Sequence, residues 1–563
     1  MNQISKQKYI LAFFLLSVIA FTSYSFLGGG SRYFAITKNM GLYGNLYKEL
    51  NNSYVDDIEP SKLMRTGMDA MLKSLDPYTN YISEAQIETY RMQQNSAAGT
   101  IGAELMQYGD NVVIEEIIEN MGAQEAGLMA GDVILTVNGK SAEGRKLAEI
   151  TQVLNGQTDT DVSISVKRFG QDAPIDAKIT RSKEVVTSVP YHGLLKDGIA
   201  YVKLKTFLKR GCTAEVVKAI SDVQKEHGEA LKGLVFDLRG NGGGLLNEAI
   251  TMVNIFVESG KVVVSTKGKI ESWDKKYKTE APPSYLNLPL TVLVNGRSAS
   301  ASEILAGAIQ DLDRGVIVGQ RSFGKGLVQQ SKKMNIIGIG NEAQIKLTVA
   351  KYFLPSGRCV QALDYSGRYR DGTISVPDSL RTKFSTENGR IVFDGSGVEP
   401  DLETDAPKYS NVTESLRKKH LIFDYATQFR LANDSIAPPK EYTFNDKDFE
   451  AFVQFLKGKN YDYQTKSEKV LERLRKSAEQ EKYFDVIAEN LSSLEEKIKN
   501  EKEQDLYKFK DELKDLLQNE IVKRYYFQNG YVQANLEKDE EVNQAIEVLQ
   551  NMDRYKEILT VAK

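Results

Sequence analysis

Three short motifs carry residue types that could together perform hydrolytic chemistry. The first, DLRGNGGG at 237–244, is rich in glycine, and the second, NGRSASASEI at 295–304, is rich in serine. The third, SFGKGLVQQ at 322–330, has a lysine between two glycines. Glycine backbone offers unhindered N–H groups to a developing oxyanion. A serine can attack a carbonyl carbon, and a lysine can serve as its base if its pKa falls from about 10.4 to roughly 7–8.

The lysine motif also resembles a phosphate-binding loop, because Gly319, Gly324 and Lys325 have the required spacing. That loop needs a serine or threonine after the lysine to hold magnesium, and then a helix whose first turn faces the phosphates. Gly326 occupies the hydroxyl position, and the following LVQQSKKMNIIG has no helical apolar stripe. The sequence therefore disfavours a nucleotide site and leaves Lys325 as either a base or an ordinary turn residue.

The serine motif follows a buried-strand pattern, LPLTVLVN, and opens a predicted helix. A serine at such a turn is exposed at the edge of the sheet, where the helix N-terminus favours negative charge. The same residues, Ser300 to Glu303, also form a capping-box pattern that explains a serine without any chemistry. DLRGNGGG has Gly242 where a similar motif of trypsin-like proteases carries serine, so that run supplies backbone only.

Histidine is scarce in this chain, and that bears on the choice of base. The three histidines are His192, His227 and His420, and none is predicted to lie at a strand-to-helix turn. This favours Lys325 as the partner of the serine, because burial between its apolar neighbours Phe323 and Leu327 would lower the pKa of the lysine. A conventional Ser–His hydrolase using His192 or His227 remains the alternative.

The elements that must position these motifs alternate between strand and helix from residue 197 to about 355. That order predicts an α/β core with a largely parallel sheet, in which sites gather at the strand-to-helix turns. All three motifs fall at or near such turns. The fold class expected for the whole chain is multidomain α/β.

Residues 96–185 form a separate compact unit with the strand patterns NVVIEEII and VILTVNGK, the latter closed by an Asn-Gly turn. Across all its elements this unit resembles a PDZ domain. The resemblance implies that the loop Gly99, Thr100, Ile101 and Gly102 presents backbone N–H groups to a peptide's terminal carboxylate. The peptide would then add as a strand beside a helix at 145–155.

The three motifs, in this order after a PDZ-like unit, resemble the carboxyl-terminal processing proteases, also called tail-specific proteases. KYFLPSGR at 351–358 and GVEPD at 397–401 extend the resemblance, which covers roughly residues 40–405. It implies a serine endopeptidase that acts on the C-terminal tails of protein substrates and needs no metal or other cofactor. An idle scaffold that binds tails without cleaving them is a second alternative.

The resemblance also implies individual roles. Ser300 would be the nucleophile, Lys325 its base, and Gln329 the residue that orients the lysine. If the segment is extended, the alternation of side chains also places 325 and 329 on one face. The implied oxyanion donors are the backbone N–H groups of Ala301 and of a glycine within 242–244, with Gly243 favoured.

The N-terminus predicts export. Lys6 and Lys8 precede nineteen uncharged residues, 9–27, which as a helix span roughly 28 Å, close to the hydrocarbon core of a bilayer. We expect a retained anchor, with a cleaved signal peptide ending near Ser23–Ser25 as the alternative. Lysines that flank such a segment stay on the cytoplasmic side of the membrane, so the rest of the chain would be exported. Together with the family resemblance, this predicts a bacterial cell-envelope protein with its catalytic part in the periplasm.

A net charge of −3 over 563 residues predicts no nucleic-acid partner, and two distant cysteines form no disulfide framework. The C-terminal region is predicted to be helical and densely charged, and its role is unknown. Homo-oligomer formation through the N- or C-terminal helices stays open.

These patterns divide the chain into five regions. They are a membrane anchor or signal at 1–30, a helical region at 31–95, the PDZ-like domain at 96–185, the α/β protease core at 186–405 and the C-terminal helices at 406–563.

Overall fold

The computed structural model describes residues 32–83, 98–183, 187–334, 343–364, 374–375, 379, 381–406 and 408–560. Contacts divide the chain into residues 1–81 and residues 82–563. The first unit contains a helix over residues 32–53 and α2 (Pro60–Lys73), which begins with a proline as helices often do; β1 (Asn80–Ile82) follows. Residues 84–95 of the helical region predicted at 31–95 lie outside the described residues.

The apolar segment at 9–27 also lies outside the described residues. Among the helices that the structure does describe, none is both long and apolar enough to cross a membrane.

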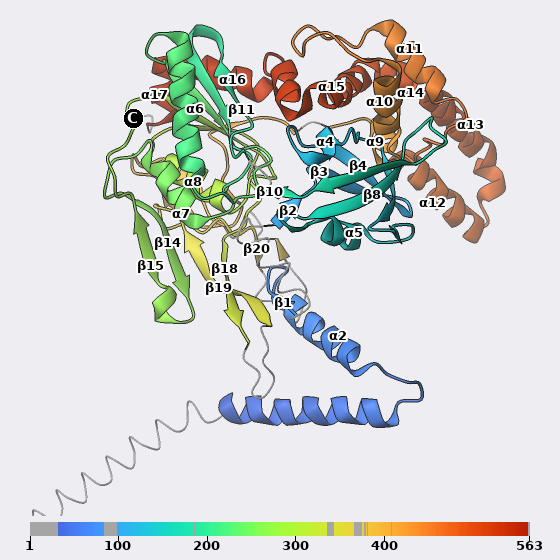
Figure 1. The fold of residues 1–563 in the computed structure, drawn as a ribbon, viewed down its shortest axis with the longest axis horizontal. Helices are drawn as coiled ribbons and strands as arrows, with labels where there is room; N and C mark the ends of the chain where they lie inside the picture. Colours follow the sequence, from blue (N-terminus) through green and yellow to red (C-terminus); the bar gives the residue numbers. More distant parts are fainter. Residues whose placement is uncertain are drawn as a thin grey trace, which may run out of the picture. The chain divides into compact units, whose positions relative to one another are not determined.

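The PDZ-like unit is an antiparallel β fold with two short helices (Figure 1). Its main sheet has the order β3-β4-β5-β8-β9 with β6 beside β5, and a small sheet has the order β10-β2-β7. The helix at 147–154 and the strands at 111–117 and 133–137 agree with the prediction. The bounds are β2 (Ala98–Thr100), β3 (Ala103–Tyr108), β4 (Asn111–Ile117), α4 (Gly122–Glu125), β5 (Val133–Val137), β6 (Lys140–Ser141), α5 (Leu147–Leu154), β7 (Gly156–Gln157), β8 (Asp161–Lys167), β9 (Ile175–Thr180) and β10 (Ser182–Lys183).

The core is built on a six-stranded sheet of order β11-β12-β13-β16-β17-β24, in which only β11 runs antiparallel to its neighbour. The predicted α/β core with a largely parallel sheet is therefore confirmed. Its elements are β11 (Tyr191–Leu194), β12 (Ile199–Lys203), α6 (Cys212–His227), β13 (Gly233–Asp237), α7 (Leu246–Asn254), β16 (Leu290–Val294), α8 (Ala301–Asp311), β17 (Val316–Gly319) and β24 (Leu402–Glu403).

A second, antiparallel group of strands adjoins this sheet and carries the chain onward from the lysine motif. β18 (Leu327–Lys333) pairs with β19 (Gln344–Phe353), which pairs with β14 (Val262–Gly268), which pairs with β15 (Lys275–Lys278). Short hairpins complete the region, namely β20 (Leu363–Asp364) with β21 (Ile374–Ser375) and β22 (Lys383–Ser385) with β23 (Ile391–Phe393).

The central sheet is covered on both faces. In β12, Ala200 and Val202 pack toward α6, α7 and α8, while the alternate residues Ile199 and Tyr201 pack on the other side against the C-terminal helices. Parallel strands buried on both faces require apolar residues at nearly every position, as in the fully buried GLVFD of β13.

The C-terminal region is helical, as predicted, but its last two helices belong to the core. Val542 and Leu549 of α16 are buried against the central sheet, and Tyr555 of α17 lies in the same cluster. Several of the preceding helices, α9, α10, α11, α14 and α15, form a cluster of their own around Phe449 and Phe452. The helices are α9 (Asn411–Lys418), α10 (Leu421–Ala432), α11 (Asp446–Phe455), α12 (Lys466–Gln480), α13 (Phe484–Glu503), α14 (Asp505–Lys508), α15 (Lys510–Asn535), α16 (Glu540–Gln550) and α17 (Met552–Ile558).

Candidate active site

The serine motif forms a strained turn between β16 and α8. Ser300 has φ +56° and ψ −111°, a backbone conformation that residues with a side chain rarely adopt. Ser298 anchors the turn from below, because its hydroxyl donates to Leu238 O at 2.9 Å and accepts from Asn295 N. Ser300 itself is half-buried. Such strained strand-to-helix turns are typical of nucleophiles.

The glycine run lies directly against this turn. A Cβ built on Gly243, where φ is +94°, would lie 2.6 Å from Ala299 O, 2.8 Å from Ala301 N and 2.9 Å from Ser300 Cβ. Only a residue without a side chain permits this approach. The run is thus placed where its backbone donors could face Ser300.

Asn241 fastens the two segments together. Its carbonyl accepts hydrogen bonds from Ala299 N at 3.0 Å and from Ser302 Oγ at 2.8 Å, and its side-chain amide donates to Leu204 O. Its Oδ1 accepts the Gly243 N–H at 2.9 Å. The predicted donor Gly243 therefore has an internal acceptor in this structure. For Ala301 N–H, no acceptor is found in the described part of the chain.

Glu303 connects the serine turn to the lysine motif. One carboxylate oxygen accepts the backbone N–H of Ser300 at 2.8 Å and that of Lys325 at 2.9 Å. The other accepts Gly324 N–H and Ser322 Oγ–H, both at 2.6 Å. The side chain is completely buried. The sequence predicts a capping role for Glu303, but its contact with the lysine segment, 22 residues on, arises only in the tertiary structure.

Burial raises the pKa of Glu303 to about 7, although the four donated hydrogen bonds act in the opposite direction. Burying a carboxyl group away from solvent costs free energy unless its oxygens accept hydrogen bonds, as those of Glu303 do. Glu303 is therefore a structural hub of the site whose protonation changes near neutral pH.

Tyr352 joins the same two residues from the opposite side. Its hydroxyl donates to Lys325 O and lies 3.3 Å from Ser300 O. It comes from β19, and the ring is buried. Ser300 and Lys325 therefore share two partners, a carboxylate for their N–H groups and a hydroxyl for their carbonyls. Tyr352 carries no signal as a site residue in the sequence beyond its place in KYFLPSGR.

The environment of Lys325 differs from the sequence expectation in one respect. Leu327 is buried, but Phe323, expected to cover the lysine as well, is 51% exposed. Close packing comes instead from the flanking glycines: a Cβ on Gly324 would lie 2.3 Å from the Ala362 side chain, and one on Gly326 would lie 2.9 Å from Gln361 N. The lysine itself is half-buried.

Gln329 lies on β18, where its side-chain amide donates to Thr348 Oγ1 at 3.3 Å. A β-bulge between Val328 and Gln329 interrupts the alternation of side chains that was used to place Gln329 beside Lys325. Its role in orienting the lysine stays a prediction.

The histidines of the alternative mechanism lie elsewhere. His192 is on the edge strand β11, His227 ends α6, and His420 precedes α10. The site, by contrast, is assembled from the ends of β13 and β16, the start of α8, the segment before β18, and β19. The structure therefore gives no support to a Ser–His pair.

Comparison with known proteins identifies the family. The family model described as "Peptidase family S41" matches residues 198–365, "PDZ domain" matches 99–179, and "Probable PDZ-protease, C-terminal helical domain" matches 412–549. The carboxy-terminal-processing protease of Bartonella bacilliformis is 34% identical over 327 residues, which cover 58% of this chain and 73% of that protein. The chain belongs to the carboxy-terminal-processing proteases.

Two further proteins are similar to this chain. A probable CtpA-like serine protease of Staphylococcus aureus is 30% identical over 375 residues, covering 66% of each chain. The solved photosystem II D1 C-terminal processing protease is 26% identical and covers 65% of this chain and 92% of that one, with a TM-score of 0.36. The protein is a serine peptidase with a PDZ domain.

The PDZ domain of this carboxy-terminal-processing protease has an open strand edge. In the part of the chain that the structure describes, β3 pairs only with β4, and its other edge approaches α5. The predicted carboxylate loop immediately precedes β3. Gly99 and Thr100 pair with neighbouring strands in the small sheet, Ile101 is buried, and Gly102 N–H donates to Thr100 Oγ1 at 3.2 Å.

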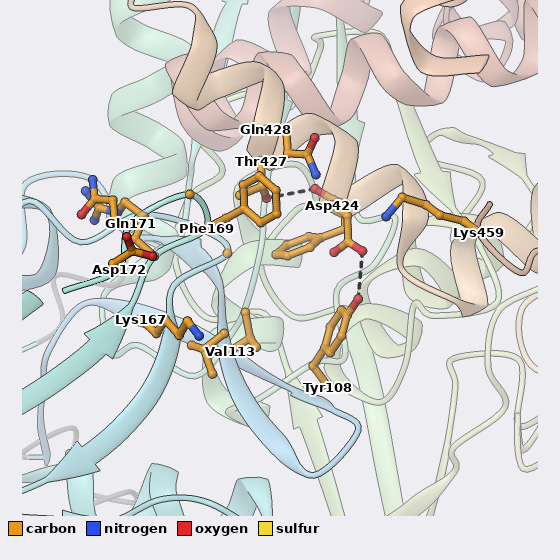
Figure 2. Close-up of a pocket in the computed structure, with 15 residues that line it drawn as sticks. Tyr108, Val113, Lys167, Phe169, Gln171, Asp172, Asp424, Thr427, Gln428 and Lys459 are labelled. Atoms are coloured by element: carbon orange, nitrogen blue, oxygen red, sulfur yellow. Dashed lines mark hydrogen bonds between the residues drawn. The ribbon is translucent and has the colours of Figure 1, made fainter. Parts of the chain in front are cut away.

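The C-terminal helices of the protease hold the PDZ domain by its sheet. Tyr108 donates to Asp424 Oδ2 at 2.9 Å, and Gln528 donates to both oxygens of Glu116 at 2.9 and 2.7 Å. Phe527 interrupts α15 with φ +53° and packs against the PDZ core. Figure 2 shows Tyr108 pointing toward Asp424 beside a cavity of about 540 Å³ between the two domains. None of its lining residues belongs to the Ser300–Lys325 site.

Proposed function

We propose that the chain is an exported endopeptidase that captures a substrate's C-terminal tail and cleaves it with a Ser300–Lys325 pair. The observation that supports this most directly is the convergence of Ser300 and Lys325, 25 residues apart, on Glu303 and Tyr352. The strained backbone turn that carries Ser300 adds to it.

In the proposed mechanism Ser300 Oγ attacks the scissile carbonyl carbon while neutral Lys325 accepts the hydroxyl proton. The tetrahedral intermediate collapses, the C–N bond breaks, and Lys325 returns the proton to the leaving amine. Water, deprotonated by the same lysine, then hydrolyses the acyl-enzyme. Gln329 is proposed to restrict the orientation of the lysine from β18.

The proposed oxyanion donors are the backbone N–H groups of Ala301 and Gly243. Ala301 N–H lies at the first turn of α8, where the helix dipole favours negative charge. For Gly243 N–H to contribute, the oxyanion must replace Asn241 Oδ1, its acceptor in this structure. Ala301 is accordingly the donor that requires no rearrangement.

The proposed route of substrate capture uses the open edge of β3. A peptide added there as a further strand would lie between β3 and α5, and its terminal carboxylate would reach the loop at 99–102. The extended tail binds mainly through its backbone, so the PDZ domain can accept different proteins.

Export is proposed from the apolar segment at 9–27 and its flanking lysines, with the catalytic part in a bacterial periplasm and the segment retained as an anchor. A reporter fused after residue 30 should be active only when it is of a type that functions outside the cytoplasm. The opposite pattern would contradict export.

The mechanism is tested with the full chain in detergent and an unstructured substrate that has an apolar C-terminus. Wild type should cleave it, Ser300→Ala and Lys325→Ala should be folded but inert, and His192→Ala should cleave normally as the matched control. Cleavage by Lys325→Ala at the wild-type rate would refute the Ser–Lys mechanism. Binding of C-terminal peptides without any cleavage by wild type would identify a scaffold.

A further inference from the structure

Two carboxylates at the start of α16 reach the segments that carry the catalytic residues. Asp539 caps α16 by accepting Val542 N–H at 3.1 Å, and Glu541 lies in its first turn. The neighbouring Val542 is fully buried against the central sheet. The two acidic side chains therefore project from a helix end that is fixed to the core, although they lie some 300 residues beyond the glycine run.

The first connection runs to the glycine run through Arg239. This side chain is 14% exposed and makes a bidentate pair with Asp237, with Nε–Oδ1 at 3.0 Å and Nη2–Oδ2 at 2.8 Å. Its Nη1 also donates to Asp539 Oδ1 at 2.9 Å and to Glu541 Oε2 at 2.6 Å. Gly240 follows Arg239 directly. The glycine run thus follows directly after an arginine that is paired with carboxylates of β13 on one side and of α16 on the other.

The second connection runs to the lysine segment through Gln320. This residue follows β17 and precedes the segment that contains Lys325. Its side-chain amide donates to the other oxygen of Glu541, Oε1, at 2.5 Å, and to Thr404 Oγ1 at 2.9 Å. A single carboxylate therefore bonds one chain segment leading to the oxyanion glycines and one leading to the base.

We propose that Glu541 and Asp539 are positioning residues for the serine protease site: through Arg239 and Gln320 they hold the glycine run and the lysine segment in register with Ser300. The proposal rests on the proposed Ser–Lys function for its catalytic consequence. Its physical part, the restraint of two segments by α16, stands independently. It also gives part of the C-terminal region a task beyond covering the sheet.

The charged residues around Arg239 form a largely buried cluster and not a set of ion pairs on the surface. The cluster contains the cations Lys203 and Arg239 and the carboxylates Asp237, Asp539 and Glu541, and Tyr201 donates to Asp237 at 2.6 Å. Side-chain exposures of the pairs with Arg239 lie between 0 and 19%. Buried charged pairs need such geometry, because one lost partner leaves an unpaired charge.

The test uses the full chain with substitutions that separate the two connections. Glu541→Gln disturbs both, Asp539→Asn weakens only the Arg239 connection while keeping a good helix cap, and Gln320→Ala removes only the second. Glu540→Gln is the matched control, because Glu540 is exposed in the same helical turn and loses the same charge. Amide hydrogen exchange is followed in peptides covering 238–246 and 319–327, together with kcat and KM.

Glu541→Gln should accelerate exchange about tenfold in both peptides and lower kcat roughly 10- to 100-fold, as for a misplaced catalytic group, with little change in KM. Asp539→Asn should affect only 238–246 and Gln320→Ala only 319–327. Exchange in Glu541→Gln equal to that in Glu540→Gln would overturn the proposal.

Two further results remain decisive. If wild type cleaves nothing, the proposed function fails while the exchange pattern still decides whether α16 restrains the segments. If Glu541→Gln does not fold, the two single-connection variants decide, and unchanged exchange in both would overturn the proposal.

Discussion

The contact between the glycine run and the turn that carries Ser300 can be tested with a single methyl group at Gly243. The added Cβ would lie 2.6 to 2.9 Å from Ala299 O, Ala301 N and Ser300 Cβ. These are backbone and β atoms, not the ends of flexible side chains. Since carbon atoms pack at about 3.5–4.0 Å, the turn must move for Gly243→Ala to fold.

The expected effect has two parts. The left-handed φ of +94° costs about 1–2 kcal/mol for any residue with a side chain, and overpacking adds about 1–3 kcal/mol. Unfolding free energy should therefore fall by about 2–5 kcal/mol. A displacement of Ser300, the proposed nucleophile, approaching about 1 Å should slow the reaction roughly 100-fold.

Neighbouring glycines separate these contributions. Gly240 has φ +77°, but a Cβ added there would have no atom within 4 Å, whereas Gly242 has neither a left-handed φ nor a neighbour. Gly240→Ala should thus lose only about 1–2 kcal/mol, and Gly242→Ala should be neutral or more stable by about 0.4–1 kcal/mol.

The assays are urea unfolding of all three variants and the rate at which a fluorophosphonate labels Ser300. Gly243→Ala should be the least stable and the slowest to react. If it is no less stable than Gly240→Ala and reacts at the wild-type rate, the close packing of the glycine run on the serine turn is wrong.

Three other predictions concern single side chains. Burial raises the pKa of Glu303 from its usual 4.5 to about 7, so the stability associated with its protonated form is complete below about pH 4.5 and lost as pH rises through 7. Across this window the unfolding free energy of wild type should fall by about 3 kcal/mol relative to that of Glu303→Gln, measured by urea unfolding at each pH. A difference between the two proteins that stays constant with pH would contradict this prediction. Tyr352→Phe should cost about 1 kcal/mol and slow labelling of Ser300 without changing KM, so unaltered labelling would exclude its bridging role. Phe527→Ala should cost about 2 kcal/mol and accelerate hydrogen exchange in the PDZ domain, and unchanged exchange there would show that α15 does not hold it.

Much of the site could be predicted because its parts are local. Ser300 follows a continuous apolar strand and opens a helix, which places it at an edge of a parallel sheet whatever the remaining packing. The alternation VILTVNGK likewise predicts a strand and turn in the PDZ domain. The exposure of Phe323 could not be anticipated, since apolar type alone does not say which side of a turn faces solvent.

Residues that act through distant contacts were not predictable in this way. Glu303 has a sufficient local explanation as a helix cap, so its sequence neighbourhood hides its contact with the lysine segment. α16 had a readable signal in the helical spacing of Val542, Ala545, Ile546 and Leu549, yet nothing in that stripe says that it covers the central sheet and not other helices.

Residue types a few positions apart were sufficient to predict the family, the α/β order of the core, the PDZ domain and the motifs that carry serine, glycine and lysine. The contacts of Glu303 and Tyr352 with Ser300 and Lys325, and the contact of Glu541 with Arg239 across 302 residues of chain, come from the tertiary packing alone. Such pairs form when separate segments pack on a common sheet. Their geometry depends on that packing, which short-range spacing does not encode.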